Sequence, residues 1–213
     1  MQADGIIFDL DGTLWDSCRS VADSWRLSLN ERYGGLIQPT EQDIRGIMGM
    51  TLEQIAQKLF SPYGARALEV CSDCIDHEYE YIAVHGGSLY PGVEALLNSL
   101  KPRHKLYIVS NCQCGYIECF TGFTGLGGCF DGYECSGSTG LSKGENIRLV
   151  VQRAGLSSPV YVGDTHMDEL SAREAGLPFI HAAYGFGSAE KANAVLRCPL
   201  DLLDIIAVSY THL

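Results

Sequence analysis

Carboxylates follow directly on apolar segments at two distant places in the chain. Asp9 and Asp11 end one apolar run, and Asp164 ends another, with Asp168 four residues further on. Two such charges about 4 Å apart repel each other by about 4 kcal/mol at an effective dielectric constant of about 20. If the four meet at one edge of a fold, a cation must lie among them. The motif offers oxygen ligands without His or Cys, which favours Mg²⁺.

Two further polar positions fit the same pattern. Ser110 and Asn111 end a segment rich in β-branched residues, and Lys143 stands at the start of a predicted helix, where it would add a positive charge. A lone Asp-x-Asp is commonly an ordinary turn or helix cap. Agreement at three strand ends together with a helix-start lysine favours a functional site.

Alternating segments must position these residues. The pattern predicts strands separated by amphipathic helices of about ten residues, which is typical of a parallel sheet covered by helices. Ligands of such sheets bind at the carboxyl ends of the strands, so Asp9, Ser110 and Asp164 are expected at one edge. The strand-like segments lie at 4–10, 106–110, 159–163 and 178–181, and a short apolar segment lies at 129–130.

Residues 16 to about 85 lack strand patterns and favour helices throughout. We therefore predict an α/β protein with a Rossmann-like parallel sheet core, residues 1–15 and 86–213, and an inserted all-helical cap, residues 16–85. Asp16 and Ser17 are expected to cap its first helix. Residues Ser209–Leu213 are expected to be a C-terminal tail that does not pack on the fold, and they are left out of the functional interpretation.

Composition narrows the possible partners and location. With 15 basic and 26 acidic residues the net charge is −11, which disfavours nucleic acid, and no apolar stretch is long enough to span a membrane. The nine Cys are too few for a disulfide scaffold, and the N-terminus has no basic lead-in. A cytoplasmic location is expected, while the sequence leaves the oligomeric state open.

With these motifs in order, the sequence resembles the haloacid dehalogenase superfamily, in its phosphoglycolate phosphatase-like and β-phosphoglucomutase-like branch with an inserted helical cap. Segments 130–132 and 183–187 also resemble that branch. The four matching motifs are Asp9–Leu14, Ser110–Asn111, Lys143 and Gly163–Asp168.

The resemblance implies a role for each motif residue. Asp9 would attack phosphorus to form an aspartyl-phosphate, and Asp11 would act as general acid and base. Mg²⁺ would be held by Asp9, by the backbone carbonyl of Asp11 and by Asp164. Asp168 would either support these ligands from behind or bind Lys143. The phosphate-binding positions would be Gly12, Thr13, Ser110, Asn111 and Lys143.

The resemblance favours a Mg²⁺-dependent phosphatase for a small phosphorylated metabolite. A phosphosugar mutase and a non-enzymatic module that cycles through phospho-Asp9 stay open as alternatives. A dehalogenase is disfavoured, because halide leaves without the proton that Asp11 would supply. Arg45 is either a contact for a second anionic group of the substrate or a solvated helix residue, and Cys112 and Cys114 are either small fillers or redox-sensitive thiols.

Overall fold

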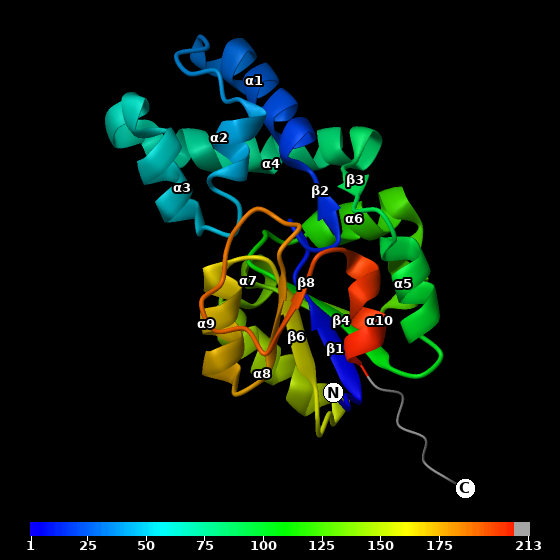
Figure 1. Cartoon of the computed structure of the whole chain (residues 1–213). Coiled ribbons are helices and arrows are strands. Elements are labelled where there is room, and N and C mark those ends of the chain that lie inside the picture. Colours follow the sequence, from blue (N-terminus) through cyan, green and yellow to red (C-terminus); the bar gives the residue numbers. More distant parts are fainter. Residues whose placement is uncertain (207–213) are drawn as a thin grey trace, which may run out of the picture.

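The chain forms a six-stranded parallel sheet with helices on both faces (Figure 1). The computed structural model describes residues 1–206. This arrangement confirms the predicted Rossmann-like α/β class. In spatial order the strands are β5 (Gly132–Cys135), β4 (Lys105–Ser110), β1 (Gly5–Phe8), β6 (Val160–Gly163), β7 (Phe179–Ala182) and β8 (Ala194–Leu196).

Side chains of β1 alternate between two apolar layers, as expected for a strand buried on both faces. Ile6 and Phe8 join the layer that contains α5 (Val93–Leu100), while Ile7 joins the layer of α8 (Lys143–Ala154) and α9 (His166–Ala175). The other helices around the sheet are α6 (Tyr116–Thr124), η2 (Leu126–Cys129), α7 (Ser136–Thr139), η3 (Pro199–Asp201) and α10 (Leu202–Ile205).

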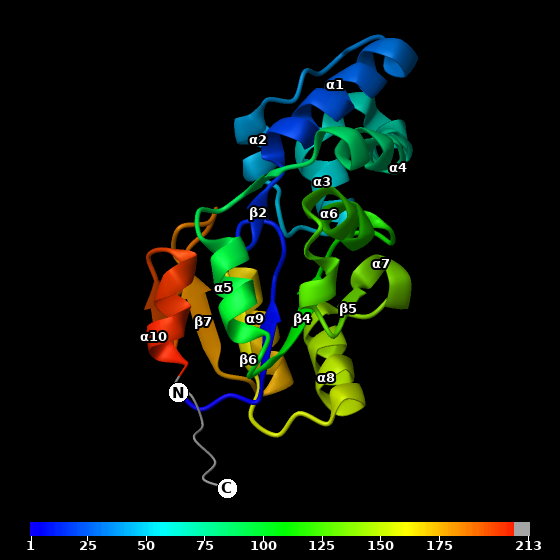
Figure 2. The ribbon, with the colours of Figure 1, turned by 90° about the vertical axis from the view of Figure 1, so that its right-hand side faces the viewer.

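A block of helices lies over the carboxyl ends of the strands (Figure 2). The chain enters this helical block through β2 (Trp15–Asp16) and leaves it through β3 (Ser88–Leu89), and these two segments pair antiparallel. The assignment of residues 16–85 as a separate cap domain stays a prediction. The helical block consists of α1 (Cys18–Tyr33), α2 (Glu41–Arg45), α3 (Leu52–Leu59), η1 (Ser61–Arg66) and α4 (Ala67–His85).

The structure corrects several details of the sequence prediction. The apolar segment at 129–130 is not itself a strand, because residues 126–129 form a 3₁₀ turn, and the strand β5 begins at Gly132. Of the predicted capping pair, Asp16 is confirmed, since its Oδ1 accepts from the amide of Cys18 at 3.0 Å. The predicted cap by Ser17 is wrong, because this side chain makes no capping bond to α1 and is engaged elsewhere. The segment Ser209–Leu213 lies outside the described residues. Within residues 1–206, no helix has the length and apolar character to cross a membrane.

Candidate active site

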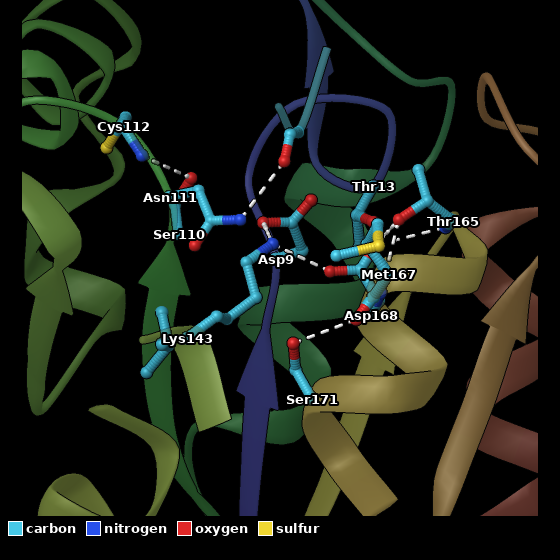
Figure 3. Close-up of polar contacts among 12 residues, drawn as sticks. Asp9, Thr13, Ser110, Asn111, Cys112, Lys143, Thr165, Met167, Asp168 and Ser171 are labelled. Atoms are coloured by element: carbon cyan, nitrogen blue, oxygen red, sulfur yellow. Dashed lines mark hydrogen bonds and ion pairs between the residues drawn. The ribbon is translucent and has the colours of Figure 1, made fainter. Parts of the chain in front are cut away.

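Three buried carboxylates meet at the carboxyl edge of the sheet. One oxygen each from Asp9, Asp164 and Asp168 lies within 4.8 Å of the others. Lys143 reaches into this group (Figure 3), with its Nζ 2.8 Å from Asp9 Oδ1 and 2.7 Å from Asp168 Oδ1. The structure thus brings together residues that lie more than 150 positions apart in the chain.

The helix starts explain how two of these side chains are held. Lys143 is the first residue of α8, whose N-terminus is fixed by a reciprocal bond pair between Ser142 and Glu145. Asp168 serves two purposes, because its Oδ2 accepts hydrogen bonds from the amide and hydroxyl of Thr165 at the start of α9, while Oδ1 accepts from Lys143. The capping and functional interpretations of Asp168 therefore both apply.

Glycine permits the loop after β1 to approach Asp164. Gly12 has φ +86°, and a Cβ at this position would lie 2.2 Å from Asp164 Oδ2. Its amide donates to the carbonyl of Trp15 at 2.9 Å and is thus already engaged within the loop. A Cβ on Gly185 would also lie 2.4 Å from Asp164 Cβ. Both glycines are required by this close packing, whereas the phosphate-binding role of Gly12 stays a prediction.

Substituting Gly12 by Ala is expected to lower the free energy of unfolding by about 2 kcal/mol or more, because a positive φ and a steric clash act together. Gly115→Ala is the matched control: Gly115 has φ +94°, but nothing lies within 4 Å of its added Cβ. Urea unfolding of both variants would separate the two costs. An equal decrease in the free energy of unfolding of the two variants would show that the loop can shift to accommodate the added Cβ, and that Asp164 is not tightly packed against it.

The electrostatics of the cluster are unbalanced. Burial, followed by repulsion from Asp168, raises the pKa of Asp9 to about 7 despite Lys143, and burial together with Asp168 and Asp9 raises the pKa of Asp164 to about 8. Burial opposes the charge of Lys143, but the two carboxylates beside it keep its pKa well above the ordinary value. Within residues 1–206, the Asp164 carboxylate accepts from two neutral donors only, the amide of Phe186 and, more weakly, the hydroxyl of Thr13.

The donor set fits a hard divalent cation. Within residues 1–206, Lys143 is the one cationic side chain that pairs with this cluster, through Asp9 and Asp168. When the three carboxylates are ionised, two negative charges remain without a partner, and all the available ligand atoms are oxygen. Asp9 and Asp164 would hold such an ion, because Asp168 is already committed to Lys143 and Thr165.

Asp11, the second acidic residue of the loop, lies in a different environment. Its Oδ1 is 2.6 Å from Ser17 Oγ and 3.0 Å from the hydroxyl of Tyr116, and these two hydroxyls are 2.7 Å apart. Burial raises the pKa of Asp11 to about 6, although both hydrogen bonds lower it. Ser17 and Tyr116 therefore fix the orientation of this carboxyl group.

Comparison with known proteins places this site in a family. A family model described as haloacid dehalogenase-like hydrolase matches residues 6–182. This chain belongs to the haloacid dehalogenase-like hydrolases. A phosphoglycolate phosphatase of Synechococcus elongatus is 32% identical, over 96% of this chain and 93% of the relative. A 5′-nucleotidase of Pseudomonas aeruginosa is 28% identical, over 89% and 86%.

A solved structure shows the same architecture. A haloacid dehalogenase-like family hydrolase from Streptococcus pneumoniae is 26% identical and superposes with a TM-score of 0.79, over 95% of this chain and 97% of the other. The family similarity identified from the motifs is therefore confirmed at the level of sequence and fold.

The remaining motif residues of this haloacid dehalogenase-like hydrolase lie beside the cluster. Ser110 is buried at the end of β4, where its hydroxyl accepts from the amide of Cys112 at 3.4 Å. Asn111 connects the sheet to the helical block, since its Nδ2 donates to the carbonyl of Gly49 at 3.1 Å (Figure 3). Cys114 is exposed. The predicted roles of Ser110 and Asn111 in phosphate binding are compatible with these positions but stay predictions.

Arg45, the candidate for a second anionic group, is held by protein carboxylates. Its Nη2 donates to Asp16 at 2.7 Å and to Glu41 at 2.9 Å, and its guanidinium lies 4.9 Å from the centre of the Phe186 ring. Its positive charge is already paired in this structure, and its role in specificity stays a prediction.

A cavity of about 90 Å³ lies between the sheet and the helical block. Asp11 and Asn111 belong to its wall on the sheet side, and Trp25 and Glu78 to its wall in the helical block. Glu78 is 6% exposed, and its Oε2 accepts a hydrogen bond of 2.6 Å from Trp25 Nε1.

Glu78 was not predicted from the sequence, and neither was the link from Ser17 and Tyr116 to Asp11. For Glu78 a signal was present: it lies on the same face of α4 as Cys71, Ile75 and Ile82, all of which are buried. A carboxylate on the apolar stripe of a helix is a candidate for a functional group, because burying it without a partner is costly.

Glu78 should make stability depend on pH. Burial raises its pKa from the ordinary 4.5 to about 8. Between these values the folded chain keeps a proton that the unfolded chain has lost, so the Glu78 contribution to stability falls as pH rises. Glu78→Gln should remove this loss. Between pH 5 and pH 8, the free energy of unfolding of the variant should therefore rise relative to that of the wild type by about 3 kcal/mol.

Urea unfolding at the two pH values measures this difference. Glu80→Gln, on the exposed side of the same helix, is the matched control and should follow the wild type at both pH values. Parallel loss of stability in the Glu78→Gln variant and the wild type would mean that Glu78 ionises as freely as a solvated side chain.

Proposed function

We propose that this chain is a Mg²⁺-dependent phosphatase that hydrolyses a small phosphomonoester through an aspartyl-phosphate on Asp9. The observation that carries the proposal is the buried convergence of Asp9, Asp164 and Asp168 around Lys143. Similarity to a phosphoglycolate phosphatase over nearly the whole chain supports it. When bound, the ion would neutralise charge on the phosphoryl group and keep the nearby carboxylates ionised.

The first step is the transfer of the phosphoryl group to Asp9. Lys143 binds Oδ1 of this carboxylate, and within residues 1–206 Oδ2 has no hydrogen-bond partner. Oδ2 is therefore the oxygen that attacks phosphorus, and the bond between phosphorus and the substrate alcohol breaks as the new bond forms. Ser110 lies next to this position at the end of β4 and would donate to a phosphoryl oxygen.

Asp11 would move the proton. In its acid form it protonates the departing alkoxide, and a pKa near 6 suits a group that must give up and regain a proton near neutral pH. As carboxylate it then accepts a proton from the water that attacks the aspartyl-phosphate, which releases phosphate and restores Asp9. Ser17 and Tyr116 hold the group in place for both steps.

Release of inorganic phosphate tests the proposal. Wild-type protein with Mg²⁺ should release phosphate from p-nitrophenyl phosphate and from small phosphate esters over many turnovers. A phosphosugar mutase would instead return the phosphoryl group to a sugar, and a regulatory module would stop at about one phosphate per chain. Either result would replace the proposed activity.

A further inference from the structure

The cavity under the helical block receives the alcohol part of the substrate if Asp11 protonates it. Asp11 lies in the cavity wall together with Tyr116, which fixes its orientation. An oxygen close enough to take a proton from Asp11 therefore lies at the edge of the cavity. The carbon chain attached to that oxygen has to extend into the cavity, toward the helical block.

The wall of this cavity offers no positive charge. Within the described residues its carboxyl groups are Asp11 and Glu78, and none of the lining side chains is Lys, Arg or His. Apolar side chains such as Ile44, Ile75 and Met48 form much of the remaining wall. A substrate carboxylate would thus be buried among largely apolar side chains with no cation to pair with, which is strongly unfavourable.

Glu78 supplies the polar group that such a cavity needs to orient a ligand. Trp25 Nε1 donates to its Oε2, whereas within residues 1–206 its Oε1 has no hydrogen-bond partner. With the side chain 6% exposed, burial favours the protonated acid. Because Oε2 accepts from the indole, the proton lies on Oε1 and can be donated to a neutral oxygen in the cavity.

We propose, building on the phosphatase function above, that the alcohol released is uncharged and carries a hydroxyl group that accepts a hydrogen bond from Glu78. Esters that carry a carboxylate, including phosphoglycolate, are then poor substrates of this chain. The relative from Synechococcus elongatus, by contrast, is named as a phosphoglycolate phosphatase. Arg45 does not change this expectation, because it is paired with Asp16 and Glu41 and does not line the cavity.

Three esters of equal length test the proposal, since they differ only in the end group. They are 2-hydroxyethyl phosphate, phosphoglycolate and phosphoethanolamine, with p-nitrophenyl phosphate as a generic fourth ester. Wild-type kcat/KM, measured by phosphate release, should be at least about tenfold higher for 2-hydroxyethyl phosphate than for phosphoglycolate or phosphoethanolamine.

Substitutions of Glu78 identify the residue responsible. Glu78→Gln keeps a donor and should keep the preference for the hydroxyl ester, whereas Glu78→Met should reduce the hydroxyl-to-carboxylate ratio about tenfold. Glu80→Gln, on the exposed side of α4, should leave the ratio unchanged. A Glu78→Met variant that keeps the wild-type ratio would overturn the role of Glu78.

The outcomes separate this inference from the function on which it rests. Phosphate release that favours phosphoglycolate would overturn the inference while supporting the phosphatase. Release that favours phosphoethanolamine would also overturn it, because Glu78 would then act as an anion that pairs with the amine. Release from none of the four esters would overturn the proposed phosphatase and the inference together.

Discussion

The Asp9→Asn variant is expected to lose at least about 10³-fold in the rate of phosphate release, because an amide cannot act as the nucleophile. The side chain keeps its size, and Lys143 keeps its bond to Asp168. The free energy of unfolding should therefore change by only about 1 kcal/mol. Steady-state phosphate release and urea unfolding of the same preparation measure both quantities.

Asp76→Asn, an exposed position on α4, is the control for the substitution and should behave as the wild type. Wild-type protein quenched during turnover should carry a phosphoryl group on the peptide that contains Asp9, and the Asp9→Asn protein should not. A variant within about tenfold of the wild-type rate would exclude a covalent mechanism at this residue.

Removal of divalent cations with EDTA is expected to reduce phosphate release by at least about 10²-fold, and Mg²⁺ should restore it. A phosphate dianion with Asp9, Asp164 and Asp168 brings about five negative charges together, and Lys143 returns only one. Substrate binding without a cation would therefore be strongly opposed by repulsion.

Thermal unfolding provides a readout that does not depend on turnover. Mg²⁺ should raise the unfolding midpoint of the wild type in the absence of substrate, because the ion binds the folded cluster and not the unfolded chain. The Asp164→Asn variant should show little or no rise. If EDTA-treated protein turned over at the full rate, or if Mg²⁺ left both midpoints unchanged, the cation would have to be removed from the proposal.

The sequence predicted the strand-end residues well because their signal is local. Asp9 and Asp164 each end an apolar run of a central strand, so the positions that face the ligand could be inferred from the strand boundaries. Edge strands were harder to find. Residues Gly132–Cys135 are only partly buried and have no apolar run, and Ala194–Leu196 is too short for a recognisable pattern.

The environment of Asp11 could not be inferred in the same way. Tyr116 lies 105 positions from Asp11, and nothing local to α6 indicates that its hydroxyl would reach that carboxyl group. Ser17 was interpreted as a helix cap because serine before a helix usually is one, but its hydroxyl bonds to Asp11 instead. Contacts that form only when segments far apart in the chain pack together, such as that of Tyr116 with Asp11, carry no short-range signature.

The two oxygens of Asp168 tie the start of a helix to the charge balance of the reaction centre. Natural selection for protein abundance and natural selection for turnover should therefore constrain this position together. Substitution of Asp168 by Asn is therefore expected to lower both abundance and turnover, whereas Asp9→Asn is expected to lower turnover alone.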